Sequence, residues 1–480
     1  MSDSGWRAMV AAAPSTRLTI AGTAVLVAGA LHVVWPAWAT LYLVLLTVGA
    51  VLAWRSTSGS CRAVSSFSPW VGAGAVLLGA VVNTAVLGLA SSLSDGLKIT
   101  ISVTYTALAL SAAFAPTSRR WPPRAAPLLF IAIHAVLVAV WLMAAPPHID
   151  VHVVLTEGSR AFLAGHNPYA MSYPNIYDEQ DTLRFYGPGF VVNGEVPFGF
   201  PYPPISLLLA LPAFVLGDVR YTGLVLLMVL TLALLGDGRG RSSRPFAVMV
   251  LCAPGAVWMM YGAWTESSIV ALLGFALWAI RRQRYTTAAI LLGLLFVSKQ
   301  YFFVALPCLW MLRPLATRAR VLTFLASAAV ATLPWLVADP PAFVRALVGY
   351  QLAPPWREDS LSLVAELIRN VGSADSGWLR LLPVAAGLLV AAIYSHRSSA
   401  TPSHFAAGLA LSLLATVMLS KNAVLNYYFL VGGALLLAAW AGLPLQGAAV
   451  PEGVVQQREP GPGRRSAHSS LTTADASGPG

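Results

Sequence analysis

Charged side chains are scarce in this sequence. Lys, Arg, Asp and Glu make up 10% of its 480 residues, whereas a soluble protein carries about a quarter. The mean hydropathy is +0.70, and many continuous apolar runs approach the ~20 residues that cross the hydrocarbon core of a bilayer. These runs lack the apolar–polar alternation of barrel strands. The sequence therefore predicts an all-α integral membrane protein.

Cysteine is also rare, and the three residues Cys61, Cys252 and Cys308 lie far apart. Their spacing excludes a disulfide framework and a cysteine metal site. No Gly-rich phosphate loop is present, so no nucleotide cofactor is predicted. Three histidines at 148, 152 and 166 share one polar segment, but their spacing is not that of metal ligands. We predict no metal site and no required cofactor, although a divalent metal stays possible.

The net charge of +11 comes from basic residues scattered among short loops. Such scattering indicates membrane topology rather than a nucleic-acid partner. If all these loops lie on one side, twenty of the 30 basic residues are cytoplasmic, together with both termini. The predicted location is the plasma membrane, which the chain crosses several times.

About 14 spans fit this topology as a polytopic helical bundle. Their approximate bounds are 18–36, 39–54, 70–91, 98–115, 125–146, 221–236, 246–262, 265–280, 286–299, 301–312, 320–337, 379–395, 404–419 and 426–443. The apolar segment 204–217 is too short to span and contains Pro212, so we predict an interfacial helix there. An outer-face loop, 147–220, then carries interfacial helices.

Three regions follow from this organisation. Residues 1–124 form a four-span N-terminal module of unknown role, and residues 125–444 form the catalytic membrane domain. Residues 445–480 are rich in Gly, Pro, Ser and Gln, a composition typical of a disordered tail. A second outer loop, 338–378, includes an amphipathic helical pattern from Leu361 to Ile368.

The polar insert 147–202 holds six of the 19 carboxylates. Its first acid, Asp150, comes just after a span ends, where a carboxylate is unfavourable unless it has a partner or a function. A partly desolvated carboxylate at this boundary can act as a general base. The alternative is a helix-end residue that marks the interface.

Three cations are predicted at the same depth on the outer side. Lys299 and Lys421 lie where one span turns directly into the next, and Arg220 follows the short apolar segment. Such side chains either snorkel to the surface or bind an anion. Together they suit a phosphate headgroup held near a carboxylate base.

Weaker candidates for binding an acceptor or a sugar are Glu157, Asn167, Tyr169, Tyr202 and Glu266. The tyrosines could stack on sugar faces, but tyrosine is also common at membrane interfaces. Glu266, in the sequence Thr-Glu-Ser-Ser, could equally be an acid at a helix start.

The order Asp150-Val-His, Gly-His-Asn-Pro-Tyr, Tyr-Pro-Pro, a short apolar helix and Arg220 resembles the first outer loop of GT-C fold glycosyltransferases. Thr-Glu-Ser-Ser and Ser-Lys-Gln-Tyr further on resemble the same group. The nearest match is the bacterial polyprenyl-phosphate-mannose-dependent type, like glycosyltransferase family 87, which includes the phosphatidylinositol mannoside mannosyltransferases of actinobacteria. The resemblance covers about residues 140–440.

This resemblance implies an enzyme that moves one sugar from a polyprenyl-phosphate carrier to a lipid or glycan acceptor on the outer face, with inversion. The resemblance assigns the role of the first-loop base to Asp150 and donor-phosphate binding to Lys299, Arg220 and Lys421. The sequence departs from many relatives, which have a paired acidic motif where Asp150 is followed by Val151 and His152. Four extra spans also precede the loop.

The mechanism is also reasonable without the analogy, because a phosphate leaving group needs only a base, cations and a held sugar. Two other functions stay open. A secondary transporter would suit many spans with buried charges, although its polar residues would lie near the midplane. A non-enzymatic membrane scaffold that contacts lipids is the other alternative.

Overall fold

The computed structural model describes residues 14–34, 36–57, 68–89, 94–114, 125–144, 147–237, 243–357, 359–371 and 377–444. The described residues as far as 443 belong to one compact unit. The predicted tail 445–480 lies outside the described residues. So do the predicted loop arginines at 7, 62, 119, 120, 124, 239 and 241.

The described chain is almost entirely helical, as predicted, and its strands are one pair of two-residue segments. Five helices are long and apolar enough to cross a membrane. They are α2 (Pro14–Val34), α3 (Ala39–Thr57), α5 (Asp95–Phe114), α6 (Ala125–Ala144) and α15 (Arg318–Ala338). Other apolar helices account for most of the remaining predicted spans. They include α4 (Pro69–Leu89), α10 (Tyr221–Leu235), α14 (Tyr285–Phe296), η4 (Gln300–Met311), α19 (Leu382–Arg397), α20 (Pro402–Met418) and α21 (Leu425–Ala441).

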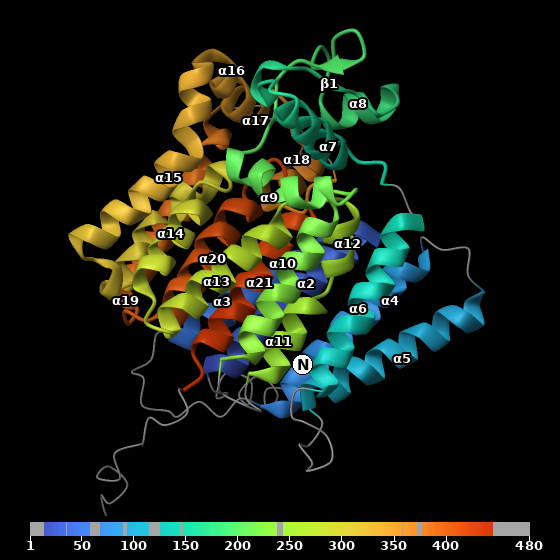
Figure 1. Cartoon of the computed structure of the whole chain (residues 1–480), viewed down its shortest axis with the longest axis vertical. Helices are drawn as coiled ribbons and strands as arrows, with labels where there is room; N and C mark the ends of the chain where they lie inside the picture. The colour runs from blue at the N-terminus through green and yellow to red at the C-terminus, as the bar shows by residue number, and fades with distance from the viewer. Residues whose placement is uncertain are drawn as a thin grey trace, which may run out of the picture. The chain divides into compact units, whose positions relative to one another are not determined.

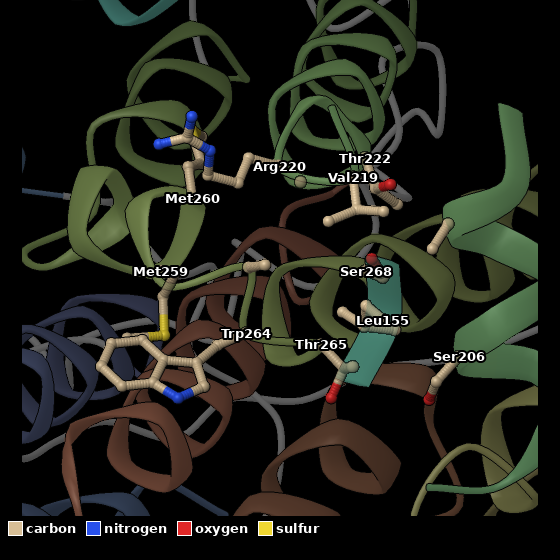
Figure 2. A pocket seen from close by; sticks show the side chains of 13 residues that line it. Leu155, Ser206, Val219, Arg220, Thr222, Met259, Met260, Trp264, Thr265 and Ser268 are labelled. Carbon is tan, nitrogen blue, oxygen red and sulfur yellow. The ribbon is translucent and has the colours of Figure 1, made fainter. Parts of the chain in front are cut away.

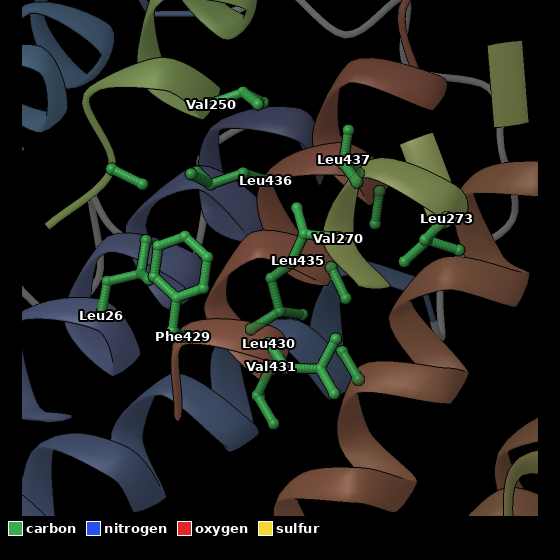
Figure 3. Packing of buried hydrophobic residues seen from close by; sticks show 14 of the residues in the cluster. Leu26, Val250, Val270, Leu273, Phe429, Leu430, Val431, Leu435, Leu436 and Leu437 are labelled. Atoms are coloured by element: carbon green, nitrogen blue, oxygen red, sulfur yellow. The ribbon is translucent and has the colours of Figure 1, made fainter. Parts of the chain in front are cut away.

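The core of the bundle surrounds α21, which is buried along nearly its whole length between α2, α20 and α13 (Glu266–Arg281). Figure 3 shows Phe429 and Leu436 of α21 among apolar side chains such as Leu26 of α2 and Val270 of α13. The approach is close at Gly432, where an added Cβ would lie 2.4 Å from Leu26 Cγ. Helix α2 therefore packs directly on the core, although the division of the chain at residue 124 stays a prediction.

The span predicted over residues 246–262 is wrong as one continuous helix. Two short helices, α11 (Arg244–Leu251) and α12 (Ala256–Tyr261), replace it. Pro254 lacks an amide proton, and Gly255 takes a left-handed φ of 85° that ends helical geometry. The break leaves backbone groups unpaired inside the bundle.

Asn83 of α4 satisfies these groups. Its Nδ2 donates to the carbonyls of Cys252 at 3.1 Å and Ala253 at 3.0 Å, and its Oδ1 accepts from Val257 N at 3.1 Å. The side chain is fully buried. A broken helix is tolerated at membrane depth when such partners complete its hydrogen bonds.

The loop 147–220 forms part of a cap on one end of the helix bundle (Figure 1). Its elements are α7 (Asp150–Leu163), η2 (Pro168–Ala170), β1 (Tyr173–Pro174), α8 (Glu179–Phe185), β2 (Glu195–Val196) and α9 (Pro204–Val215). Helix α7 buries Val151, Val154 and Leu155 on one face, the spacing of an amphipathic helix. The predicted short helix at 204–217 is present as α9, which packs against α7.

The second predicted loop adds α16 (Pro340–Val344), η6 (Arg345–Gly349), α17 (Tyr350–Leu352) and α18 (Leu363–Val371), and η7 (Gly377–Arg380) leads into α19. Helix α18 confirms the amphipathic helix predicted from residue 361. Figure 1 shows α16, α17 and α18 at the same end of the bundle as α7 and α8. The two loops together build the cap.

Candidate functional site

A cavity of about 450 Å³ lies between the cap and the helix ends. Asp150 and Lys299, predicted from separate parts of the sequence, both line it, as does Tyr202. The other polar or aromatic side chains that line it are His148, Tyr177, Asp181, Phe185, Tyr186, Trp258, Tyr261, Trp264, Tyr350, Gln351, Arg357, Asp359, Asn422, Asn426 and Tyr427. The volume is within the range of small-molecule sites.

Asp150 is the first residue of α7, and its carboxylate is held from two directions. The Tyr186 hydroxyl donates to Oδ2 at 2.8 Å, and the Val151 amide donates to Oδ1 at 2.8 Å. The Asp150 amide in turn donates to the Tyr177 hydroxyl at 3.2 Å. The positive end of the helix dipole also favours a carboxylate here. The carboxylate is thus fixed and half-buried at the cavity wall.

Burial raises the pKa of the Tyr186 hydroxyl well above its usual value, and the charge of Asp150 raises it further. The pKa of Tyr177 is raised by burial and by Asp150 in the same way. Tyr186 therefore stays protonated and keeps donating its proton to the carboxylate. The two hydrogen bonds orient the Asp150 carboxylate at the cavity wall, where it can accept a proton from an incoming hydroxyl.

Lys299 is only 5% exposed, and its Nζ lies 3.0 Å from Oε1 of the fully buried Glu266. The ammonium also lies 4.5 Å from the ring centroid of Tyr202, a cation–π contact. Asn426 Nδ2 donates to the same Glu266 oxygen at 2.9 Å. Glu266, predicted to bind an acceptor or start a helix, does begin α13 and pairs with the cavity's lysine.

Arg357 is a second cation at the cavity that sequence reasoning did not select. Its Nη2 lies 2.6 Å from Asp359 Oδ2, and its Nε donates to Oδ1 at 2.9 Å. Burial lowers the pKa of Arg357, but the bonds to Asp359 outweigh it and raise the pKa overall. Burial likewise raises the pKa of Asp359, but Arg357 holds it below its usual value. Both groups stay charged.

The second loop is tied to the segment between α20 and α21. Leu361 N donates to Ala423 O at 2.7 Å, and Ala423 N donates to Ser360 Oγ at 2.7 Å. Arg357 N donates to Lys421 O at 3.3 Å. These bonds place Arg357 over the cavity. The sequence signal was only the short string Pro-Pro-Trp-Arg-Glu-Asp-Ser, which has no periodicity to indicate its position.

Arg220 lies at a different place from Lys299. Its guanidinium pairs with Asp218 at 2.6 Å, and it borders a space of about 10 Å³ with Met260 and Trp264 (Figure 2). That volume is about one water molecule. Burial would raise the pKa of Asp218, but bonds from His152 and Arg220 hold it well below its usual value. The predicted ring of three cations is therefore not found around the cavity.

Lys421 also differs from its predicted position. Its Nζ donates to the carbonyls of Pro354 at 2.6 Å and Leu352 at 3.3 Å, so it supports the second loop. Its neighbour Asn422 lines the cavity instead. Of the three predicted cations, Lys299 alone is among the residues that line this cavity in the described chain.

The remaining candidates have local roles in the cap. Glu157 pairs with Arg160 one turn along α7, and Asn167 Oδ1 accepts from Tyr169 N at 3.0 Å as a helix cap. Tyr169 is fully buried, and its hydroxyl donates to Tyr202 O at 2.8 Å. These three stabilise the cap rather than face the cavity. Tyr202 and Glu266 are the candidates of this group that reach Lys299.

Within the described residues, no group of three or more His, Cys, Asp or Glu side chains is arranged to hold a metal ion. The described charges at the cavity wall are the carboxylates of Asp150, Asp181 and Asp359 and the cations of Lys299 and Arg357. The arrangement offers a fixed carboxylate, two cations and many aromatic faces, which suits a ligand with an anionic group and a polar ring.

Comparison with known proteins agrees with this chemistry. Residues 200–420 match the model of glycosyltransferase family 87. No curated protein and no solved structure matches the chain. The matched region contains Tyr202, Glu266, Lys299 and Arg357, while Asp150 precedes it.

Proposed function

Because residues 200–420 match the model of glycosyltransferase family 87, we propose that the chain is a membrane glycosyltransferase of the GT-C type that moves mannose from a polyprenyl-phosphate carrier. The acceptor is a lipid or glycan on the outer face of the plasma membrane. The family favours glycosyl transfer over the secondary transporter and the scaffold. The single observation that supports the proposal is that Asp150 and Lys299 line one cavity.

Asp150 acts as the base in this proposal. Its carboxylate is fixed by Tyr186 and the α7 amide, so it accepts the proton of the acceptor hydroxyl as that oxygen attacks the anomeric carbon. The bond from the anomeric carbon to the carrier phosphate breaks, and the phosphate leaves with the electron pair. Attack from the face opposite the phosphate inverts the anomeric centre.

Lys299 and Arg357 hold the carrier phosphate. Lys299 already has Glu266 as its carboxylate partner, and Arg357 has Asp359. Because these ion pairs hold both cations in place, phosphate binding does not have to order a mobile side chain. Prearranged cations stabilise the charge that develops on the leaving oxygen. Tyr202, under the Lys299 ammonium, and the other aromatic side chains of the wall provide faces for the sugar.

The test is transfer of labelled sugar by membranes that contain the full chain. Polyprenyl-phosphate donors carrying mannose, glucose, galactose or arabinose are offered separately with endogenous acceptors. We expect incorporation from the mannose donor into a lipid or glycan fraction. Incorporation from another of these donors would correct the sugar, and no incorporation from any of them would contradict the proposal.

A further inference from the structure

A second chamber of about 400 Å³ adjoins the cavity. The two share Val33, Asp359, Val424 and Leu425 in their walls. Three elements that are distant in sequence complete the chamber, which is bounded by His32 of α2, Arg184 of α8 and Arg369 of α18. The N-terminal helix, whose role the sequence left open, thus contributes to the wall of both spaces.

The residues that line this side chamber include more cations than carboxylates, the reverse of the main cavity. Its described wall has two arginines, Arg184 and Arg369, against the single carboxylate of Asp359. The main cavity has three carboxylates against two cations. Both arginines have carboxylate partners, Asp181 and Asp359 for Arg184 and Glu366 for Arg369, so an anionic group in the chamber meets cations that ion pairs already hold in place.

Two side chains around the chamber have hydrogen-bonding capacity that a ligand could use. The guanidinium of Arg184 contacts Asp359 at 3.8 Å and Asp181 at 3.9 Å, both longer than a normal hydrogen bond. His32 is 5% exposed, and its Nε2 has no hydrogen-bond partner among the described residues. A buried nitrogen without a partner is unfavourable, and a ligand oxygen would supply one.

Asp359 links the two spaces. Its Oδ2 lies 2.6 Å from Nη2 of Arg357, which faces the main cavity, and 3.8 Å from Nη2 of Arg184, which faces the chamber. A ligand phosphate bound by Arg184 competes with the Asp359 carboxylate for this guanidinium, and the same carboxylate holds Arg357. A ligand in the chamber therefore alters the ion pair between Asp359 and Arg357, a cation of the proposed transfer site.

We propose that the side chamber is a second subsite, which binds the phosphate group of a lipid while the sugar occupies the main cavity. Arginine recognises phosphate by forked, charge-assisted hydrogen bonds, and the apolar Val33, Val424 and Leu425 border the path between the spaces. The phosphate can come from a phospholipid acceptor or from a second polyprenyl phosphate. The explanation of why two subsites lie side by side rests on the proposed transferase function. Binding of a lipid phosphate in the side chamber does not.

The test is photolabelling of the full chain in phosphatidylcholine nanodiscs without any sugar donor. The probes are a photoreactive phosphatidic acid, a photoreactive polyprenyl phosphate and, as a phosphate-free control, a photoreactive diacylglycerol. We expect one or both phosphate probes to label peptides around His32, Arg184 and Arg369. The more strongly labelling probe identifies the source of the phosphate.

The variants Arg184→Gln and Arg369→Gln should each lower this labelling by about tenfold, the effect of losing a charge-assisted bond. Arg160→Gln is the matched control, because Arg160 has the same ion pair three residues along a helix as Arg369 with Glu366, but borders neither space. Equal labelling by diacylglycerol, no labelling, or unchanged labelling in both variants would overturn the proposal. Labelling without sugar transfer would instead contradict the transferase function alone.

Discussion

Lys299 and Glu266 form a buried ion pair, with 3.0 Å between Nζ and Oε1. Each neutralises a charge that would be unfavourable alone at 5% and 0% exposure. The pair joins α13 to the start of η4 beneath the cavity. Lys299 therefore has a structural partner, Glu266, as well as its proposed ligand, the donor phosphate. Variants of the two residues should separate these two roles.

Glu266→Gln should destabilise the protein by about 3–5 kcal/mol, because it leaves the Lys299 charge buried without a partner. The double variant with Lys299→Met removes both charges and should recover most of that stability, while sugar transfer stays lost. Thermal unfolding in detergent and the transfer assay measure the two effects. A double variant that transfers sugar normally would exclude Lys299 from phosphate binding.

Tyr186→Phe should lower the rate of transfer by about tenfold with little change in KM for the donor, because it removes a hydrogen bond to the proposed base. Tyr173→Phe is the control. It also loses a hydrogen bond within the cap, to Pro168 O at 3.1 Å, but does not line the cavity. Equal rates for both variants would mean that Tyr186 serves the fold alone.

Asn83→Ala should destabilise the protein by about 3 kcal/mol, since the Cys252 carbonyl and the Val257 amide at the α11–α12 break lose their partner and the Ala253 carbonyl keeps only the Ala256 amide. Thr84→Val, next along α4, is the control, because its hydroxyl bonds Ala80 O and Ser102 Oγ and none of the groups at the break. Thermal unfolding of the purified variants is the measurement. Equal midpoints would show that the break does not depend on α4.

The free energy of unfolding should decrease at acidic pH as Asp218 becomes protonated. Its pKa in the folded protein lies below the usual 3.8, so the carboxylate's stabilising effect is complete above that value and is lost as the pH falls below it. The wild type should exceed Asp218→Asn in thermal midpoint at about pH 6, and the difference should shrink towards about pH 3. A constant difference would contradict this linkage.

The sequence predicted the helical membrane class, the cap and the cavity residues Asp150, Lys299 and Tyr202, because hydropathy and the position of charged and aromatic residues next to spans are local signals. Arg357 and Asp359 were not found, since their position depends on the backbone bonds of Leu361 and Ala423 across distant segments. His32 was missed for a similar reason: only the packing of α2 on α21 brings it to the chamber.

The broken helix was missed for another reason. Pro254-Gly255 is a known break signal, but the apolar residues on both sides favoured one span over residues 246–262. The missing information was a partner for the freed carbonyls, and Asn83 supplies it from a helix about 170 residues earlier.

The most direct test of the account compares wild type with Asp150→Asn for transfer of labelled mannose from a polyprenyl-phosphate donor in proteoliposomes. Donor binding is measured in parallel by photolabelling with the same carrier. We predict a loss of transfer of at least about a hundredfold with donor binding and thermal midpoint retained. Transfer by Asp150→Asn at the rate of the wild type would contradict the account.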